Sequence, residues 1–103
     1  MAEIINLKDY IKYSAGSVVS KTLKQNPAGT ITLFAFDSGQ GLSEHSAPFD
    51  AVVQIIEGKG SIIIEGKEHN LKEGELITMP ANVPHAVKAV QKFKMLLIMI
   101  RGS

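Results

Sequence analysis

Cysteine is absent from this chain of 103 residues, and its absence narrows the chemistry open to the protein. Without cysteine there is no disulfide bond, no thiolate metal site and no cysteine nucleophile. The composition is therefore compatible with a reducing compartment.

An excess of either charge is missing as well. Eleven Lys and Arg residues stand against ten Asp and Glu residues, which gives a net charge of +1 with neutral histidine. Because no block of basic residues occurs, nucleic acids and anionic membrane surfaces are poor candidates for partners.

Long hydrophobic runs and a secretory signal are not found either. The longest apolar run, residues 95–100, is far below the roughly 18 residues needed to cross a bilayer. The N-terminal sequence MAEIINLKDY lacks the basic-then-apolar order of a signal peptide. We therefore expect a cytoplasmic protein.

The length of the chain fits one domain, residues 1–103, with no room for a second. Its composition, 45% hydrophobic and 20% charged, is ordinary for a globular protein and unlike that of a disordered one. A domain of this size buries roughly 60–65% of the surface that its unfolded chain exposes, so we expect a modest hydrophobic core.

Short segments rich in β-branched and apolar residues recur along the chain, separated by Gly, Pro and Asn. The segments are typical of strands and the separating residues of turns. Because no helical pattern alternates with them, they favour an all-β sandwich or barrel. Gly58 and Gly60 are expected to interrupt the strand that begins at Ala51, so that a separate strand resumes at Ser61. The predicted strands are 17–24, 30–36, 51–56, 61–65, 69–71, 76–79, 85–89 and 93–100.

The two ends of the chain carry weaker patterns. Residues 5–13 fit either a short helical turn capped by Asn6 or an ordered arm that packs Leu7 and Ile11. Residues 92–94, Lys-Phe-Lys, are interpreted as the solvated start of the last strand. The methionines are interpreted as fillers of gaps in the core.

Two histidines stand beside proline-marked bends. His45 comes directly before the bend at Pro48, and His85 comes directly after Pro84. Pro80 and Pro84 stiffen the loop that leads to His85 and therefore hold this residue in place. The pattern predicts that both histidines lie at one shared mouth of a barrel.

Glycines are spaced regularly around the first histidine. Gly39 precedes His45 by an interval of five residues, and Gly58 closes the stretch 39–58. Both glycines are expected at sharp turns with a positive φ.

A second spacing pattern surrounds the other histidine, over residues 74–89. Gly74 is followed after five residues by Pro80, then by Asn82 and, after two more residues, by His85. Positive φ is expected at Gly74 and at Asn82, because Asn tolerates the left-handed region better than most residues. The stretch ends at Ala89.

These two stretches resemble the two motifs of the cupin family. The first motif of cupins is Gly, five residues, His-x-His, three or four residues, Glu, six residues and Gly. The second is Gly, five residues, Pro-x-Gly, two residues, His, three residues and Asn. The resemblance covers about half of the chain. It implies a double-stranded β-helix, or jelly-roll barrel, with a short N-terminal arm or helical turn.

The departures from these motifs bear on metal binding. Metal-dependent cupins use both histidines and the Glu of the first motif, but Ala47 and Ala51 occupy two of those three positions. Only His45 and His85 remain, whereas a catalytic divalent metal usually takes three protein ligands. Asp50 is a substitute ligand only if a bulge turns it inward. The resemblance therefore implies at most a weakly bound divalent transition metal.

Alanine at two ligand positions also removes volume and polarity from the expected site. Either neighbouring side chains fill that space, so that the two histidines are merely hydrogen-bonded at a solid barrel mouth, or a small molecule occupies it. We favour the second alternative. The predicted ligand pocket comprises His45, His85, Ala47, Ala51, Val53, Phe34, Phe36 and Met79. His69 is expected at the surface or the rim.

Three functions fit these residues. The first is a cupin that holds a small molecule by hydrogen bonds to His45 and His85. The second is a metal-dependent enzyme of isomerase, lyase or dioxygenase type, as found among cupins. The third is an interaction module, since strands 31–36 and 95–100 carry apolar residues on both faces and many small cupins are homodimers. A Ser-His-acid triad is not expected, because Ser43, Glu44 and His45 are adjacent on an extended segment and no nucleophile elbow is present.

Overall fold

The computed structural model describes residues 2–101. One short helix, α1 (Leu7–Tyr10), precedes the strands, and the predicted all-β class is confirmed. No helix within the described residues has the length and apolar character needed to cross a membrane; the cytoplasmic location stays a prediction. The strands are β1 (Val18–Asn26), β2 (Gly29–Phe36), β3 (Gly41–His45), β4 (Phe49–Ile64), β5 (Lys67–Lys72), β6 (Leu76–Met79), β7 (His85–Lys88) and β8 (Phe93–Arg101).

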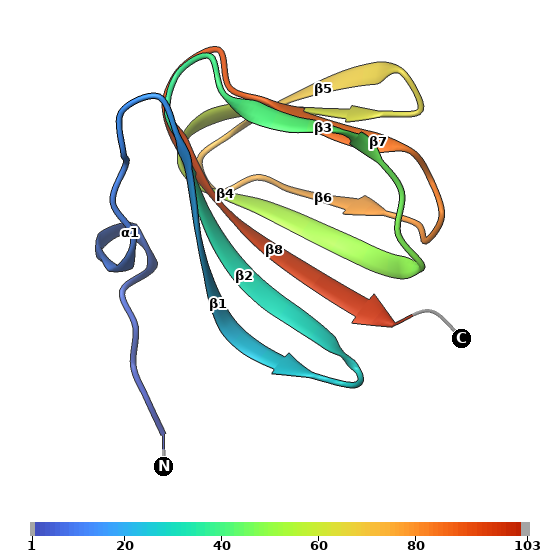
Figure 1. The fold of residues 1–103 in the computed structure, drawn as a ribbon, viewed down its shortest axis with the longest axis horizontal. Coiled ribbons are helices and arrows are strands. Elements are labelled where there is room, and N and C mark those ends of the chain that lie inside the picture. The colour runs from blue at the N-terminus through green and yellow to red at the C-terminus, as the bar shows by residue number, and fades with distance from the viewer. Residues whose placement is uncertain (1, 102–103) are drawn as a thin grey trace.

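The strands form one antiparallel sheet in the order β1-β2-β8-β4-β7-β3, with β5 and β6 also paired to β4. The sheet curls into two facing layers (Figure 1). We call β1, β2, β8, β6 and the first half of β4 the large layer. The small layer contains β3, β7, β5 and the second half of β4. The curled antiparallel sheet forms a half-barrel, which agrees with the jelly-roll barrel that the cupin resemblance implies.

Strand β4 belongs to both layers, and here the prediction of a break is wrong. It runs without interruption from Phe49 to Ile64. Gly58 adopts φ +78°, and the register with β8 shifts between Ile55 and Glu57. A bulge and a left-handed residue bend a strand without ending it. The glycine therefore carries β4 from the large layer into the small one.

The structure also tests the positive φ values and the strands that the sequence predicts. Positive φ is confirmed at Gly39, Gly74 and Asn82, with 66° at the asparagine. Strand β3, in contrast, lies outside the predicted strands. Its sequence, GLSEH, is poor in residues that favour strands, and its pairing with β7 supplies what local preference does not.

The main core lies between the two layers. Alternate residues of each strand point into this space, as the period of a strand requires. Phe36 stacks on Phe93 with ring centroids 4.8 Å apart, and Phe34 stacks on Phe36 at 5.7 Å. Met79 and Met95 are buried there, as expected of methionines that fill gaps; Met1 lies outside the described residues. The buried members are Phe36, Ala51, Val53, Ile55, Ile62, Leu71, Met79, Val87, Ala89, Phe93 and Met95.

A second, smaller core lies on the outer side of the large layer, beneath the N-terminal arm. Ile11 is fully buried against Leu33 and Ala35, and Leu7 packs beside them. The helical turn is present, but the side chain of Asn6 forms no capping hydrogen bond. Both predicted alternatives for residues 5–13 therefore hold in part, since a single helical turn sits within an arm that is anchored by packing.

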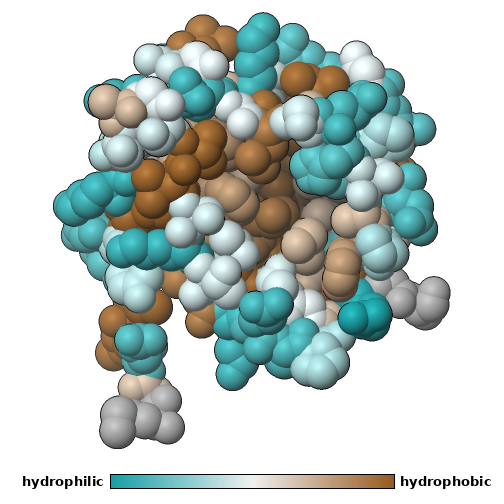
Figure 2. Space-filling view, viewed as in Figure 1, coloured by the Kyte–Doolittle hydropathy of each residue, from teal (hydrophilic) through white to brown (hydrophobic). Residues whose placement is uncertain are grey.

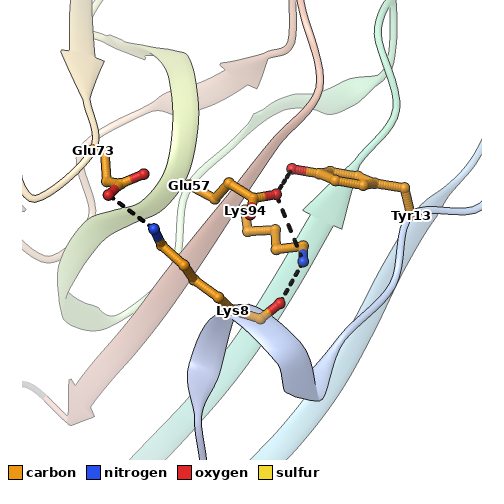
Figure 3. A network of polar contacts seen from close by, with 5 residues as sticks. All are labelled: Lys8, Tyr13, Glu57, Glu73 and Lys94. Atoms are coloured by element: carbon orange, nitrogen blue, oxygen red, sulfur yellow. Dashed lines mark hydrogen bonds and ion pairs between the residues drawn. The ribbon is translucent and has the colours of Figure 1, made fainter.

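A group of polar contacts fastens the same arm, and it corrects the interpretation of residues 92–94 as solvated (Figure 3). Lys94 is buried, because the arm covers the outer side of β8 at this point. Its Nζ donates to the carbonyl of Lys8 and lies 3.6 Å from Oε2 of Glu57. The hydroxyl of Tyr13 donates to the same carboxylate at 2.6 Å. We call Lys94, Glu57 and Tyr13 the arm clasp.

Candidate ligand-binding site

The two histidines singled out in the sequence lie side by side. His45 and His85 are register partners on β3 and β7, at the edge of the small layer. Their ring centroids are 4.4 Å apart, with an angle of 65° between the rings. A bulge between Leu42 and His45 sets this register. The side chain of His45 is exposed and that of His85 is half-buried.

Each imidazole is anchored in the same way, by the backbone two residues before it. Nδ1 of His45 lies 2.7 Å from the carbonyl oxygen of Ser43, and Nδ1 of His85 lies 3.0 Å from that of Val83. A carbonyl oxygen only accepts hydrogen bonds, so Nδ1 must carry the proton in both rings. In the neutral imidazole, Nε2 is then left with a free lone pair. The pair thus offers two acceptors that the backbone contacts leave unused.

The proline-containing loop before His85 is tied to residues 47–50, which lead into β4 and form its start. The amide of Asn82 donates to the carbonyl of Ala47 at 2.8 Å, and the amide of Ala81 donates to Oδ1 of Asp50 at 2.9 Å. Asp50 is exposed and faces this loop, so it does not replace a missing ligand. These bonds fix the position from which β7, and with it His85, begins.

The space between the two layers is hollowed at its middle and lined by hydrophobic residues (Figure 2). Of the predicted pocket residues, Phe36, Ala51, Val53 and Met79 are buried in the main core, with at most 4% of their surface exposed. Phe34 is only partly buried, and so is Ala47 at the end near the histidines. The predicted set therefore divides into residues buried in the core beneath the hollow and partly exposed residues at its rim.

Several residues of the rim were missed by the sequence analysis. Ile64 is the register partner of His85 on β4, and Leu42 is that of Val87 on β3. Both pack partly exposed against the main core. Their positions depend on the bulge in β3 and on how β4 pairs with β7 after its bend, and this register is not visible in the sequence. The acceptors Ser43 and Val83 were missed for the same reason.

A catalytic metal needs more donors than this site provides. Within residues 2–101, no group of three or more His, Cys, Asp or Glu side chains is placed to hold a metal ion. His69 on β5 is the register partner of Ile62 on β4, so β4 lies between His69 and His85 on β7. The side chain of His69 is half-buried. The set of two imidazoles therefore does not fit the usual three-ligand centre.

Comparison with known proteins agrees with this fold and these motifs. Residues 32–101, more than half of the chain, match the family described as "Cupin domain". This protein is a cupin. The cupin is 36% identical to a conserved protein of unknown function from Streptococcus pyogenes, with a TM-score of 0.93 over 100% of this chain and 90% of the other.

Two further solved structures resemble this cupin. A cupin superfamily protein from Desulfitobacterium hafniense is 26% identical, with a TM-score of 0.92 over 99% of this chain and 94% of the other. A cupin 2 conserved barrel domain protein from Leptotrichia buccalis is 40% identical, with a TM-score of 0.91 over 94% of this chain and 47% of the other. This chain thus spans about half the length of the Leptotrichia protein.

Proposed function

We propose that this cupin binds a small organic molecule in the hollow between its layers, held by hydrogen bonds to Nε2 of His45 and His85. The observation that carries the proposal is the pair of anchored imidazoles, whose Nδ1 atoms are engaged by backbone carbonyls. Two fixed acceptors beside an apolar hollow match the usual build of a small-molecule site, in which few polar groups orient a ligand among apolar ones. The favoured ligand therefore has an apolar body and a hydrogen-bond donor.

Phenol and anisole are matched probes for this site, since they share an apolar ring and only phenol has a hydroxyl donor. We expect phenol to bind roughly two- to tenfold more tightly than anisole, the worth of one hydrogen bond. His45→Ala and His85→Ala should remove this preference. NMR titration of the full chain measures it.

His69→Ala provides the control, because His69 lies on β5 and is separated from His85 on β7 by strand β4. It should keep the preference for phenol. Equal affinity for both probes in the unaltered chain, or a preference that survives both substitutions at the pair, would overturn the proposed site.

A second candidate function is weak binding of a divalent transition metal by the same two rings. It is favoured by the contacts of Nδ1 with Ser43 and Val83, because histidine ligands usually donate their other ring nitrogen to a carbonyl or carboxylate. Titration with Cu²⁺ and Zn²⁺ by calorimetry should show dissociation constants in the micromolar range or weaker. His45→Ala and His85→Ala should abolish binding. A nanomolar affinity would contradict a site of two ligands.

We also propose that the chain forms a homodimer through the outer side of the large layer. Ile31, Ile98 and Val52 form one row across β2, β8 and β4. All three are only half-buried and pack against neither core, and Ile100 beside them is 52% exposed. An uncovered apolar row of this kind is typical of an interaction surface.

The dimer is tested by light scattering. Ile98→Glu should convert a dimer to a monomer, because it places a charge at the middle of the row. Ile63→Glu, which changes a half-buried isoleucine of the small layer, should leave the dimer intact. A monomeric unaltered chain at high concentration would be evidence against the proposal.

A further inference from the structure

A second concave site lies away from the histidine pair. A cleft of about 400 Å³ opens between the β4–β5 hairpin and the loop that follows β7. Lys59, at the cleft, precedes Ile64, the register partner of His85, by five residues along β4. Five residues of strand span roughly 16 Å, so the cleft and the histidine pair are separate sites.

Two lysines face each other at this cleft. Lys59 on β4 and Lys72 on β5 are direct register partners, and both line it. Like charges directly opposite each other on neighbouring strands are destabilising. Within residues 2–101, the ion pairs are Lys8–Glu73 and Lys94–Glu57, so neither cleft lysine is paired with a carboxylate.

The acidic side chain at the cleft does not neutralise this pair. Glu75 also lines the cleft, but its Oε1 accepts from the backbone amide of Lys72 at 2.8 Å, within the turn after β5. Counting Lys59 and Lys72 as positive and Glu75 as negative, the lining carries a net charge of +1. Oε2 of Glu68 accepts from the hydroxyl of Ser61 in the lining at 2.7 Å, so neither Glu68 nor Glu75 forms an ion pair with the two lysines.

The rest of the lining is suited to an apolar group with polar edges. Val90 is 76% exposed at the cleft and supplies its apolar surface, whereas the side chain of Leu71 belongs to the main core. The side chains of Asn70 and Gln91 add amide donors. A volume of about 400 Å³ lies within the range of small-molecule sites in proteins.

We propose that this cleft binds a small organic anion. Its carboxylate or phosphate group lies between Lys59 and Lys72, where it relieves their repulsion, and its apolar body packs against the exposed side chain of Val90. Charge-assisted hydrogen bonds from ammonium groups to such oxygens are stronger than neutral ones. The proposal does not depend on the histidine site.

The test compares three probes that share a phenyl ring, namely phenylacetate, phenyl phosphate and the neutral phenylacetamide. Each is titrated into the full chain at low ionic strength and followed by NMR, because salt screens exposed charges. We expect at least one anion to bind roughly three- to tenfold more tightly than the amide, with shifts at Asn70 and Val90. Preference for the carboxylate or for the phosphate identifies the group that the cleft selects.

Substitutions of single lysines locate the anion on the protein. Lys59→Gln and Lys72→Gln should each remove most of the preference for the anion, whereas Lys67→Gln, an exposed lysine elsewhere on β5, should keep it. His85→Ala should also keep it, so failure at one site is distinguishable from failure at the other.

Thermal unfolding tests the repulsion between Lys59 and Lys72, which the binding experiments do not measure. Because each cleft substitution removes a repulsion, Lys59→Gln and Lys72→Gln should leave the unfolding temperature equal to or above that of the unaltered chain. A lower temperature would show that the lysines stabilise the fold, and equal affinity for all three probes would show that no anion site exists; either result overturns the proposal.

Discussion

Gly58→Ala is expected to destabilise the fold by roughly 2–5 kcal/mol. Gly58 adopts φ +78°, which costs an L-residue about 1–2 kcal/mol. A Cβ at this position would also lie 2.6 Å from the carbonyl oxygen of Lys92 and 3.1 Å from Cβ of Phe93. Overpacking of this kind typically adds about 1–3 kcal/mol. Urea denaturation of the purified variant measures the loss.

Gly39→Ala is the matched control, since Gly39 opens the stretch that Gly58 closes. Gly39 has nearly the same backbone conformation, with φ +83°, but a Cβ added there would have no neighbouring atom within 4 Å. Its substitution should cost only the conformational part, about 1–2 kcal/mol. If both variants lose the same stability, then the close approach of Lys92 to Gly58 contributes nothing to the requirement for glycine at the bend in β4.

Glu57→Gln is expected to lower the free energy of unfolding by about 2–3 kcal/mol. The substitution removes the negative charge beside Lys94, whose side chain is only 6% exposed. Breaking a fully buried pair costs about 3–5 kcal/mol, because it leaves a buried charge uncompensated. We expect less here, since the side chain of Glu57 is 36% exposed and solvent weakens the interaction. Chemical denaturation at pH 7 measures the loss.

The arm clasp also makes stability depend on pH in a definite direction. The hydrogen bond from Tyr13, with the charge of Lys94 as a further cause, lowers the pKa of Glu57 below its ordinary value of 4.5. The contribution of Glu57 is therefore present above pH 4.5 and is lost as the pH falls through its lowered pKa. Glu57→Gln should lose less stability than the unaltered chain over that acidic range.

At alkaline pH, the contribution of the arm clasp to stability depends on the protonation of Tyr13. Burial, followed by the hydrogen bond with Glu57, raises the pKa of Tyr13 above its ordinary value of 10.0. Its contribution is present below pH 10.0 and is lost as the pH rises through the raised pKa. The clasp should thus be intact between pH 4.5 and pH 10.0.

Two variants check that the effect belongs to the buried charge. Glu73→Gln breaks the ion pair with Lys8, whose partners are 49% and 53% exposed, and should change stability by no more than about 0.5 kcal/mol. Glu57→Gln combined with Lys94→Met should recover much of the loss, because no unpaired charge remains buried. A double variant as unstable as Glu57→Gln alone would contradict the role given to the charge of Lys94.

Much of the fold followed from local patterns in the sequence. Apolar β-formers between turn residues identified all the strands except β3, and the spacing around Gly39, Gly74 and Asn82 identified where the backbone has positive φ. These features depend on the preferences of a few neighbouring residues. The continuous β4 did not follow, because a glycine in a strand either ends it or bends it, and only pairing with β8 and β5 decides which.

The candidate sites show the same division. His45 and His85 stood out in the sequence by their spacing, whereas the anchoring of Nδ1 by Ser43 and Val83 did not. The burial of Lys94 was misjudged because its cover comes from the N-terminal arm, where its partner Lys8 lies 86 residues earlier in the chain. The facing pair of Lys59 and Lys72 likewise became visible only through strand register.

By itself, the sequence determined the all-β class, the cupin motifs and the presence of Ala47 and Ala51 at two positions where the motif resemblance implies metal ligands. The tertiary structure alone decided which side chains meet, namely the two imidazoles, the arm clasp and the lysines of the cleft. The physical reason is that turn and strand preferences act between neighbours in the chain, whereas register, bulges and the cover of an outer face arise from contacts between segments that are distant in sequence.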